Sequence, residues 1–254
     1  MNNMAHPGRF LCALLMTALT AVTAQAAVVI HGARVIYPAD QQEVVVRLEN
    51  KGDRPSLVQL WLDNGDKYAT PATAQAPFTA LPPVMRIEPG RQQAPRLRYT
   101  GAPLPRDRES LFWLNVLEVQ PNTVDTGDRN LLELSFRSRL RVFFRPQGLP
   151  YPKGAAAPKL SWKLVRHAGG HALEVLNPTP YHVSLGSVEL VGQGGRYPKA
   201  PNQQVDDSLL LPSGDIKRFV LPTLRTRPAG ALKVEFTAVS DHGARISHSA
   251  DITS

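Results

Sequence analysis

Short runs in which apolar and polar residues alternate cover most of this chain, and they predict β-strands. The runs are separated by Gly, Pro, Asn or Asp, which favour turns. No segment sustains the apolar spacing of about 3.6 residues that is typical of an amphipathic helix. The predicted strands are AVVIHGARVIYP, EVVVRLENKG, SLVQLWLDNGD, MRIEPGRQQAPRLRY, SLFWLNVLEV, LLELSFRSRLRVFF, LSWKLVRHAGGHALEVLN (a hairpin), HVSLGSVELVG, KRFVLP and ALKVEFTAVSD.

This spacing of strands and turns, in a chain of 254 residues with 23 prolines, predicts an all-β fold of antiparallel, immunoglobulin-like sandwiches. The segment from Gln147 to Pro158 is rich in Pro, Gly and Ala and has the composition of a linker. We therefore predict two β-sandwich domains, residues 27–147 and 148–254. In the second domain, Gly169 and Gly170 are expected at the turn of a hairpin.

The first 26 residues have the pattern of a removable secretory signal. Arg9 precedes an apolar stretch that begins at Phe10, and Ala24-Gln25-Ala26 is a small-residue processing pattern. A membrane anchor is the alternative, but the apolar stretch is shorter than the about 20 residues needed to span a bilayer. Cys12, the only cysteine, lies within this signal, so the exported chain is expected to contain no disulfide. Removal of the apolar stretch also leaves no stable membrane segment.

The run from Leu132 to Arg145 has apolar residues at alternate positions and then becomes basic. Leu132, Leu134 and Phe136 alternate with polar residues, as in a half-buried strand. An edge strand with such an apolar row can extend the sheet of another protein. The alternative is that the row lines the core of its own domain.

These residues also carry a family resemblance. RESLFWLNV, the alternating run and RVFFRP together resemble the first-domain signature of periplasmic pilus-assembly chaperones. The resemblance extends over the chain after the signal, through ARVIYPAD (33–40), LPPVMRIEPG (81–90), NPTPYHVSLGSVEL (177–190) and DHGAR (241–245). The short segment from Glu118 to Asn130 resembles the branch of the family with a short loop between the last two strands of domain one.

The resemblance implies a cleft between the domains in which two basic residues, Arg34 and Arg141, anchor the C-terminal carboxylate of a pilus or fimbrial subunit. The alternative is that both are ordinary solvated strand residues. The family usually has Lys where this chain has Arg141. The charge is kept, but a planar guanidinium replaces a mobile ammonium. Leu132, Leu134 and Phe136 would then enter the open groove of the subunit by donor-strand complementation, over a strand of about 30 Å.

The resemblance assigns supporting roles to five further residues. Glu109, Arg145 and Asp241 match an interdomain ion network, although each can equally be a surface charge. Pro55 and Leu57 match an apolar patch that faces an outer-membrane usher, although a turn proline and a core leucine fit the same pattern. The family also has a cis bond near Leu81-Pro82-Pro83.

Several other functions are poorly supported by the sequence. His167 and His171 stand four residues apart, as zinc ligands do on a helix, but the glycines between them favour a turn. There is no nucleophile elbow, phosphate loop or Cys/His cluster, so neither an enzyme nor a cofactor or metal site is expected. The net charge of +8 is not concentrated in a basic block of the kind that binds nucleic acid.

Through the family resemblance, the sequence predicts a periplasmic, non-enzymatic chaperone that binds, folds and caps pilus subunits and delivers them to an outer-membrane usher. The main alternative is a secreted two-domain β-sandwich adhesin that binds carbohydrate. An adhesin would need exposed aromatic platforms on loops, whereas Trp61, Trp113 and Trp162 all lie within predicted strands. A hydrolase is a second alternative, but its nucleophile motif is missing.

Overall fold

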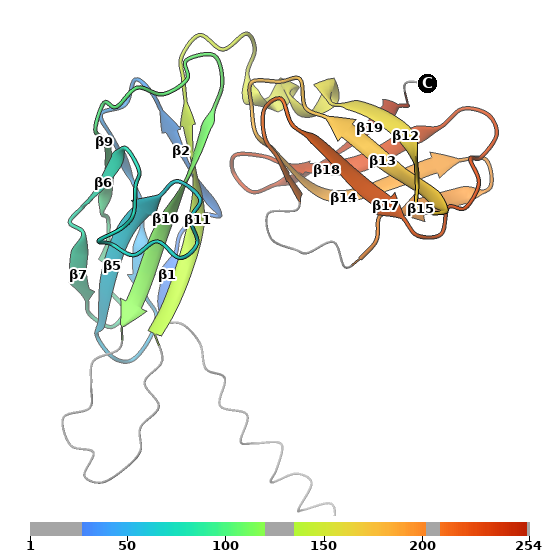
Figure 1. The fold of residues 1–254 in the computed structure, drawn as a ribbon. Coiled ribbons are helices and arrows are strands. Elements are labelled where there is room, and N and C mark those ends of the chain that lie inside the picture. The colour runs from blue at the N-terminus through green and yellow to red at the C-terminus, as the bar shows by residue number, and fades with distance from the viewer. Residues whose placement is uncertain (1–26, 120–134, 202–208, 253–254) are drawn as a thin grey trace, which may run out of the picture.

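The protein consists of two β-sandwiches, seen in a computed structural model that describes residues 27–119, 135–201 and 209–252 (Figure 1). The sandwiches lie at a marked angle to each other and are joined by the segment that follows β11 (Figure 1). The all-β fold predicted from the alternation is therefore confirmed.

The first sandwich is built around a five-stranded sheet of order β2-β11-β10-β5-β7, with the three-stranded sheets β3-β9-β6 and β1-β4-β8 completing it. Its strands are β1 (Val28–Ile30), β2 (Arg34–Pro38), β3 (Glu43–Val45), β4 (Leu48–Asn50), β5 (Ser56–Asp63), β6 (Phe78–Leu81), β7 (Val84–Ile87), β8 (Gln92–Gln93), β9 (Arg96–Tyr99), β10 (Ser110–Val119) and β11 (Ser135–Arg145).

Alternate residues of the long strands form the core of this sandwich, as the sequence pattern predicts. Leu114 and Val116 of β10 and Leu140 and Val142 of β11 are all buried there. The ring of Tyr37 packs against those of Phe78, Tyr99 and Phe144 in this core. The Leu81–Pro82 peptide bond is cis, which confirms the expectation from the family resemblance.

The second sandwich pairs a three-stranded sheet, β12-β13-β17, with a sheet of order β15-β14-β18-β19 in which β16 also joins β14. Its elements are the 3-10 helices η2 (Lys153–Ala155) and η3 (Ala157–Lys159), then β12 (Ser161–His167), β13 (Gly170–Leu176), β14 (Val183–Gly192), β15 (Gly195–Pro198), β16 (Leu210–Leu211), β17 (Ile216–Leu221), β18 (Lys233–Val239) and β19 (Arg245–Asp251). Trp162 is 1% exposed and packs against Phe219 and Phe236 at the centre of its core.

Two details differ from the sequence prediction. The segment expected to be a linker contains η2 and η3, and its apolar Ala156 and Ala157 are buried in the second core. The hairpin turn is formed by Ala168 and Gly169, both with positive φ, while Gly170 already begins β13. Gly170 is needed there because a Cβ atom would lie 2.8 Å from the carbonyl oxygen of Leu224.

Candidate functional site

Arg34 and Arg141 lie next to each other on neighbouring strands where the two sandwiches meet. They are register partners in the parallel ladder of β2 and β11. Nη1 of Arg34 donates a hydrogen bond to the carbonyl oxygen of Val239, at the end of β18 in the second sandwich, over 3.4 Å. The structure thus brings together the two basic residues that the sequence analysis singled out and places them at the boundary between the sandwiches.

The electrostatics of this pair favour an anion. Burial lowers the pKa of the Arg34 guanidinium, and the neighbouring charge of Arg141 lowers that pKa further, while Asp241 and Glu109 partly oppose the shift. The guanidinium of Arg141 lies over the ring of Trp113, 5.3 Å from its centroid. Two partly desolvated cations side by side repel each other, and a carboxylate bound to both would relieve that repulsion.

Glu109, Arg145 and Asp241 form one connected ion network that crosses between the sandwiches. Nε of Arg145 donates to Oε1 of Glu109 over 2.7 Å. Its Nη1 and Nη2 donate to Oδ2 and Oδ1 of Asp241 over 2.7 and 3.1 Å, in a two-pronged pair. Oε2 of Glu109 accepts a hydrogen bond from the backbone N–H of His182 over 2.8 Å. Arg145 therefore contacts both of the other predicted residues, and its pair with Asp241 links the first sandwich to the second.

Within this network, Arg145 and Asp241 each favour the charged form of the other. Burial alone would favour the neutral form of Asp241, but the hydrogen bonds and charge of Arg145 outweigh it and lower the pKa of that carboxyl. Burial also opposes the charge on Arg145, but its contacts with Asp241 and Glu109 give it a net raised pKa. A partly buried, hydrogen-bonded ion pair of this kind is costly to break by removing one partner.

The sequence analysis missed one cation at the same boundary, Lys153 of η2. Its Nζ and the guanidinium carbon of Arg145 lie 5.8 and 5.4 Å from the ring centroid of Tyr181. Burial lowers the pKa of Lys153, as do the charges of Arg145 and Arg34, whereas Glu109 and Asp241 act against the shift. Lys153 follows a proline in a non-periodic segment, where no pattern in the sequence points to a site.

Among the described strands, β11 has neighbours on both sides along only half of its length. Its residues 141–145 pair with β2 on one side, whereas residues 135–140 pair only with β10 among the described strands. Phe136 lies in this free half and is half-buried, on the face of the strand that also carries the core residue Leu140. Leu132 and Leu134 lie outside the described residues, as does most of the segment from Glu118 to Asn130 that was expected to be a short loop.

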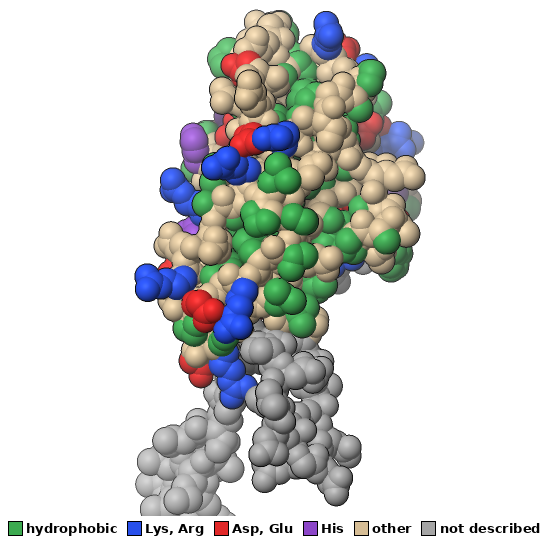
Figure 2. Space-filling model, turned by 90° about the vertical axis from the view of Figure 1, so that its left-hand side faces the viewer, with side chains coloured by type: hydrophobic (Ala, Val, Ile, Leu, Met, Phe, Trp, Pro, Cys, Tyr) green, Lys and Arg blue, Asp and Glu red, His purple; other side chains and the backbone are tan. Residues whose placement is uncertain are grey.

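Leu57 is exposed and is therefore not the core leucine of the alternative interpretation. It is 47% exposed, and Val84, on the neighbouring strand β7, is 46% exposed. Pro55, which directly precedes β5, is half-buried. Hydrophobic side chains also reach the surface on the face of the molecule shown in Figure 2, with Lys and Arg side chains around them.

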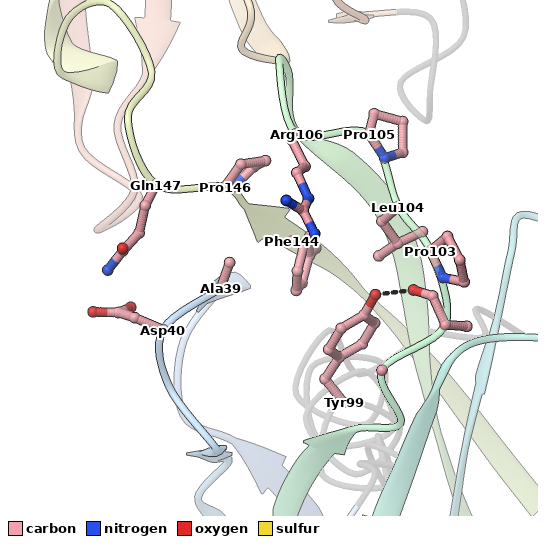
Figure 3. Close-up of a pocket in the computed structure, with 12 residues that line it drawn as sticks. Ala39, Asp40, Tyr99, Pro103, Leu104, Pro105, Arg106, Phe144, Pro146 and Gln147 are labelled. Carbon is pink, nitrogen blue, oxygen red and sulfur yellow. Dashed lines mark hydrogen bonds between the residues drawn. The ribbon is translucent and has the colours of Figure 1, made fainter.

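A pocket of about 480 Å³ lies at the end of the first sandwich near the start of the interdomain connection (Figure 3). Asp40 and Gln147 lie on the opposite side of it from Tyr99 and Leu104 (Figure 3). The Tyr99 hydroxyl donates to the carbonyl oxygen of Ala102, which fixes the proline-rich wall of the pocket. None of the site residues predicted from the sequence lines this pocket.

His167 and His171 do not face each other. They lie at the end of β12 and in β13, and the register pairs His171 with Arg166. In the described part of the chain, no group of three or more His, Cys, Asp or Glu side chains could hold a metal ion. Likewise, no helix within the described ranges is long and apolar enough to cross a membrane.

The tryptophans do not form exposed platforms of the kind that an adhesin would use. Trp61 and Trp162 are 8% and 1% exposed. Trp113 is half-buried, and the guanidinium of Arg139 covers its ring at 4.6 Å from the centroid. None of the three tryptophans therefore supplies the exposed aromatic surface on which the carbohydrate-binding alternative depends.

Comparison with known proteins identifies the family. Residues 27–150 match the N-terminal domain of the PapD pili and flagellar-assembly chaperones, and residues 155–250 match the C-terminal domain of the PapD pili assembly chaperones. The chain is 44% identical to the fimbrial chaperone YadV of Escherichia coli over 222 residues, covering 86% of this chain and 87% of YadV. It is 40% identical to the chaperone protein FimB/FhaD of Bordetella pertussis over 232 residues, covering 90% and 89% of the two chains.

Solved structures show the same relationship. The crystal structure of the YadV chaperone matches with a TM-score of 0.73 and 41% identity, over 89% of this chain and 100% of that one. The CupB2 chaperone of Pseudomonas aeruginosa matches with a TM-score of 0.71 and 35% identity, over 89% of this chain and 100% of CupB2. Both domains, their order and their fold agree, and members of this family are not enzymes. The chain belongs to the PapD family of pili assembly chaperones.

Proposed function

We propose that this chain captures fimbrial subunits in the periplasm by lending them a strand and passes them to an outer-membrane usher. The observation that carries the proposal is the position of Arg34 and Arg141 at the end of the free half of β11. An anion anchor and an unpaired strand edge in line with each other suit a partner that has a terminal carboxylate and lacks a strand. The Salmonella enterica SafB chaperone, 26% identical to this chain, was solved in complex with the SafA pilin.

The subunit's C-terminal carboxylate would dock between the guanidinium groups of Arg34 and Arg141. Each guanidinium can offer two parallel N–H donors to a carboxylate, so Arg141 is expected to replace the usual lysine with the charge retained. The carboxylate then fixes the register of the subunit strand along β11. A slip by one residue would turn every subunit side chain to the other face.

The apolar face of β11 would complete the subunit's sandwich. Phe136 is five residues from Arg141, which corresponds to about 17 Å along a strand. Leu134 and Leu132 continue the same alternation in sequence, and we propose that all three enter the subunit's groove. The free half of β11 supports this proposal because its backbone N–H and C=O groups on that side have no described strand partner.

Two further regions would serve the same cycle. The network of Glu109, Arg145 and Asp241 would hold the two sandwiches at the angle that admits a subunit. The exposed Leu57, together with Pro55, would contact the usher. Val84, which is similarly exposed on the adjacent strand, would extend that apolar patch.

Export would precede all of these steps, with residues 1–26 removed as a signal. Cleavage after Ala26 would leave Ala27 as the first residue of the periplasmic protein. Mass spectrometry of the periplasmic fraction tests this directly. A periplasmic product that still contains Cys12 would contradict the proposed cleavage.

A pull-down tests the proposed function. The tagged chain is expressed with the fimbrial gene cluster of its own genome, and proteins that co-purify from the periplasm are identified by mass spectrometry. We expect a small β-sandwich subunit in a one-to-one complex with the parent chain, and its loss in the Arg34→Ala variant. Recovery of the chain alone, or its retention on a glycan array without any subunit, would favour the adhesin alternative.

A further inference from the structure

The outer face of the sheet that contains β11 carries a buried polar cluster that the proposed function does not use. Asp63 of β5 and Asn115 of β10 are 0% exposed, although neither belongs to the hydrophobic core. Their neighbours Leu62 and Leu114 point into the core, so Asp63 and Asn115 lie on the opposite face of the sheet. We call these two residues, with Arg137, Arg139, Trp61 and Trp113, the Asp63 cluster.

Hydrogen bonds tie the cluster to three strands. Oδ1 of Asp63 accepts from Nη2 of Arg139 over 2.7 Å, and Oδ2 accepts from Nδ2 of Asn115 over 2.7 Å. Oδ1 of Asn115 in turn accepts from Nε and Nη2 of Arg137 over 2.9 and 2.7 Å. Asp63 also accepts from the backbone N–H of Gly65 over 2.8 Å. One buried carboxylate therefore connects β5, β10 and β11.

The same two arginines also stack on the rings of tryptophans. The guanidinium carbon of Arg137 lies 4.8 Å from the ring centroid of Trp61, and that of Arg139 lies 4.6 Å from the ring centroid of Trp113. Stacking of a partly desolvated guanidinium on an indole restricts its rotamers and adds to the hydrogen bonds. Arg137 and Arg139 are therefore held both by hydrogen bonds within the sheet face and by stacking.

The position of the two arginines along β11 links the cluster to the free edge. Arg137 and Arg139 lie within residues 135–140, the half of β11 that has no described partner on its outer side. On the other half, beginning at Arg141, pairing with β2 supports the strand. Edge strands with a single neighbour open more readily than central ones. The cluster thus holds the part of β11 that pairs with β10 but not with β2.

We propose that Asp63 is a positioning residue that keeps the free half of β11 in an extended, ordered state before a subunit arrives. This inference rests on the proposed function, in which β11 is the strand that is lent to the subunit. A buried ion pair is a poor source of stability compared with apolar packing, so the contact of Asp63 with Arg139 of the donated strand indicates a role in order. A strand that is ordered in advance loses less conformational freedom on binding, which strengthens the complex.

Hydrogen exchange followed by mass spectrometry tests the proposal on the purified full chain without any subunit. The variants are Asp63→Asn, which keeps the shape but removes the charge, and Arg139→Lys, which keeps the charge but removes the planar fork. The matched control is Val58→Ala, on the same strand β5, where Val58 is 0% exposed on the core face. We expect exchange in residues 135–140 to rise about tenfold relative to residues 141–145 in both cluster variants, and not in the control.

The outcomes separate this proposal from the proposed function. A uniform rise over both halves of β11, or the same ratio as in Val58→Ala, would overturn the positioning role. If Asp63→Asn fails to fold, the milder Arg139→Lys variant decides. The subunit that co-purifies with the parent chain serves as the binding probe, and we expect Asp63→Asn to bind it about tenfold more weakly than Val58→Ala does. Equal affinities of Asp63→Asn and Val58→Ala for the subunit would also overturn the proposal. If no subunit co-purifies with the parent chain, that result counts against the proposed function, and hydrogen exchange alone decides whether Asp63 positions β11.

Discussion

Arg34 and Arg141 are register partners on adjacent parallel strands, so two cationic side chains leave β2 and β11 at the same level. Burial and the charge of Arg141 both lower the pKa of Arg34. The repulsion between the two cations would be relieved by an anion that binds to both. The pair is therefore better suited to binding than to stabilising the fold.

Alanine at either position should abolish subunit capture without weakening the fold. Arg34→Ala and Arg141→Ala each remove a charge-assisted contact worth about 2–5 kcal/mol to the complex. The melting temperature should change little, because the relief of repulsion between the two cations offsets the loss of contacts such as the hydrogen bond from Arg34 to Val239. Arg141→Lys should retain most of the binding.

The matched control for the anchor is Arg86→Ala. Arg86 lies on β7, where it pairs with Glu88 over 2.7 Å at an exposed position. Subunit recovery and thermal unfolding are measured for all four variants. Normal recovery with both anchor variants would mean that no carboxylate binds there.

Much of the fold could be predicted from the sequence because most strands bury one face and therefore alternate. β19 was missed because it is an edge strand with the sequence RISHSAD, in which exposed and half-buried residues give no apolar period. β6 was missed because only Phe78–Leu81 form the strand, directly after a segment rich in Pro and Ala. Short or exposed strands are specified by their neighbours in the sheet rather than by their own pattern.

The site was predictable only in part, for a different reason. Arg34 and Arg141 were identified from the family resemblance, since nothing in their local pattern distinguishes them from solvated strand residues. Asp63 is followed by Asn64 and Gly65 and has the appearance of a turn residue, yet it is fully buried beneath two arginines that are more than 70 positions away in sequence. Contacts of this kind depend on sheet register, which a single sequence does not reveal.

The donated face of β11 can be tested by a pair of neighbouring substitutions. Phe136 is half-buried on the core face of the strand, whereas Ser135 is exposed. Phe136→Glu should weaken subunit binding by several kcal/mol, because it would place an unpaired carboxylate in the subunit's apolar groove. Ser135→Glu should cost less than half as much, since alternate side chains point to opposite faces.

Competition of each variant against the parent chain for one purified subunit gives the ratio of affinities. Circular dichroism checks that both variants are folded. Equal losses at the two positions would show that the partner does not distinguish the faces of β11.

Replacing Lys153 by methionine should stabilise the free protein. Burial, together with the charges of Arg145 and Arg34, lowers the pKa of Lys153 in spite of the attraction of Glu109 and Asp241, so its charged form is disfavoured in the folded state. Removing that charge while keeping the apolar stem should add about 1 kcal/mol, or about 2–4 °C in melting temperature. Lys159→Met is the control, because Lys159 is exposed and lies 4.8 Å over the ring of Tyr151. A lower melting temperature for Lys153→Met would mean that its attraction to the two carboxylates dominates.

Acid should weaken the contact between the sandwiches through Asp241. Because the pKa of Asp241 is lowered in the folded state, its contribution is fully present above the ordinary value of 3.8. The contribution is lost as the pH falls through the lower, folded-state value, since the protonated carboxyl no longer forms a two-pronged ion pair with Arg145. Below about pH 4 the protein should therefore lose stability that the Asp241→Asn variant already lacks.

Thermal unfolding of the parent and of Asp241→Asn between neutral and strongly acidic pH measures this effect. At pH 7 the variant should be less stable by about 1.5–3 kcal/mol, the usual cost of losing a hydrogen bond to a charged group. The difference between the two proteins should shrink as the pH falls below about 4, because the parent then becomes neutral at the same position. Asp107→Asn is the control, since Asp107 is 71% exposed and its pair with Arg108 spans 3.4 Å on the surface. A gap between parent and Asp241→Asn that stays constant over the whole range would show that the ion pair with Arg145 does not hold the sandwiches together.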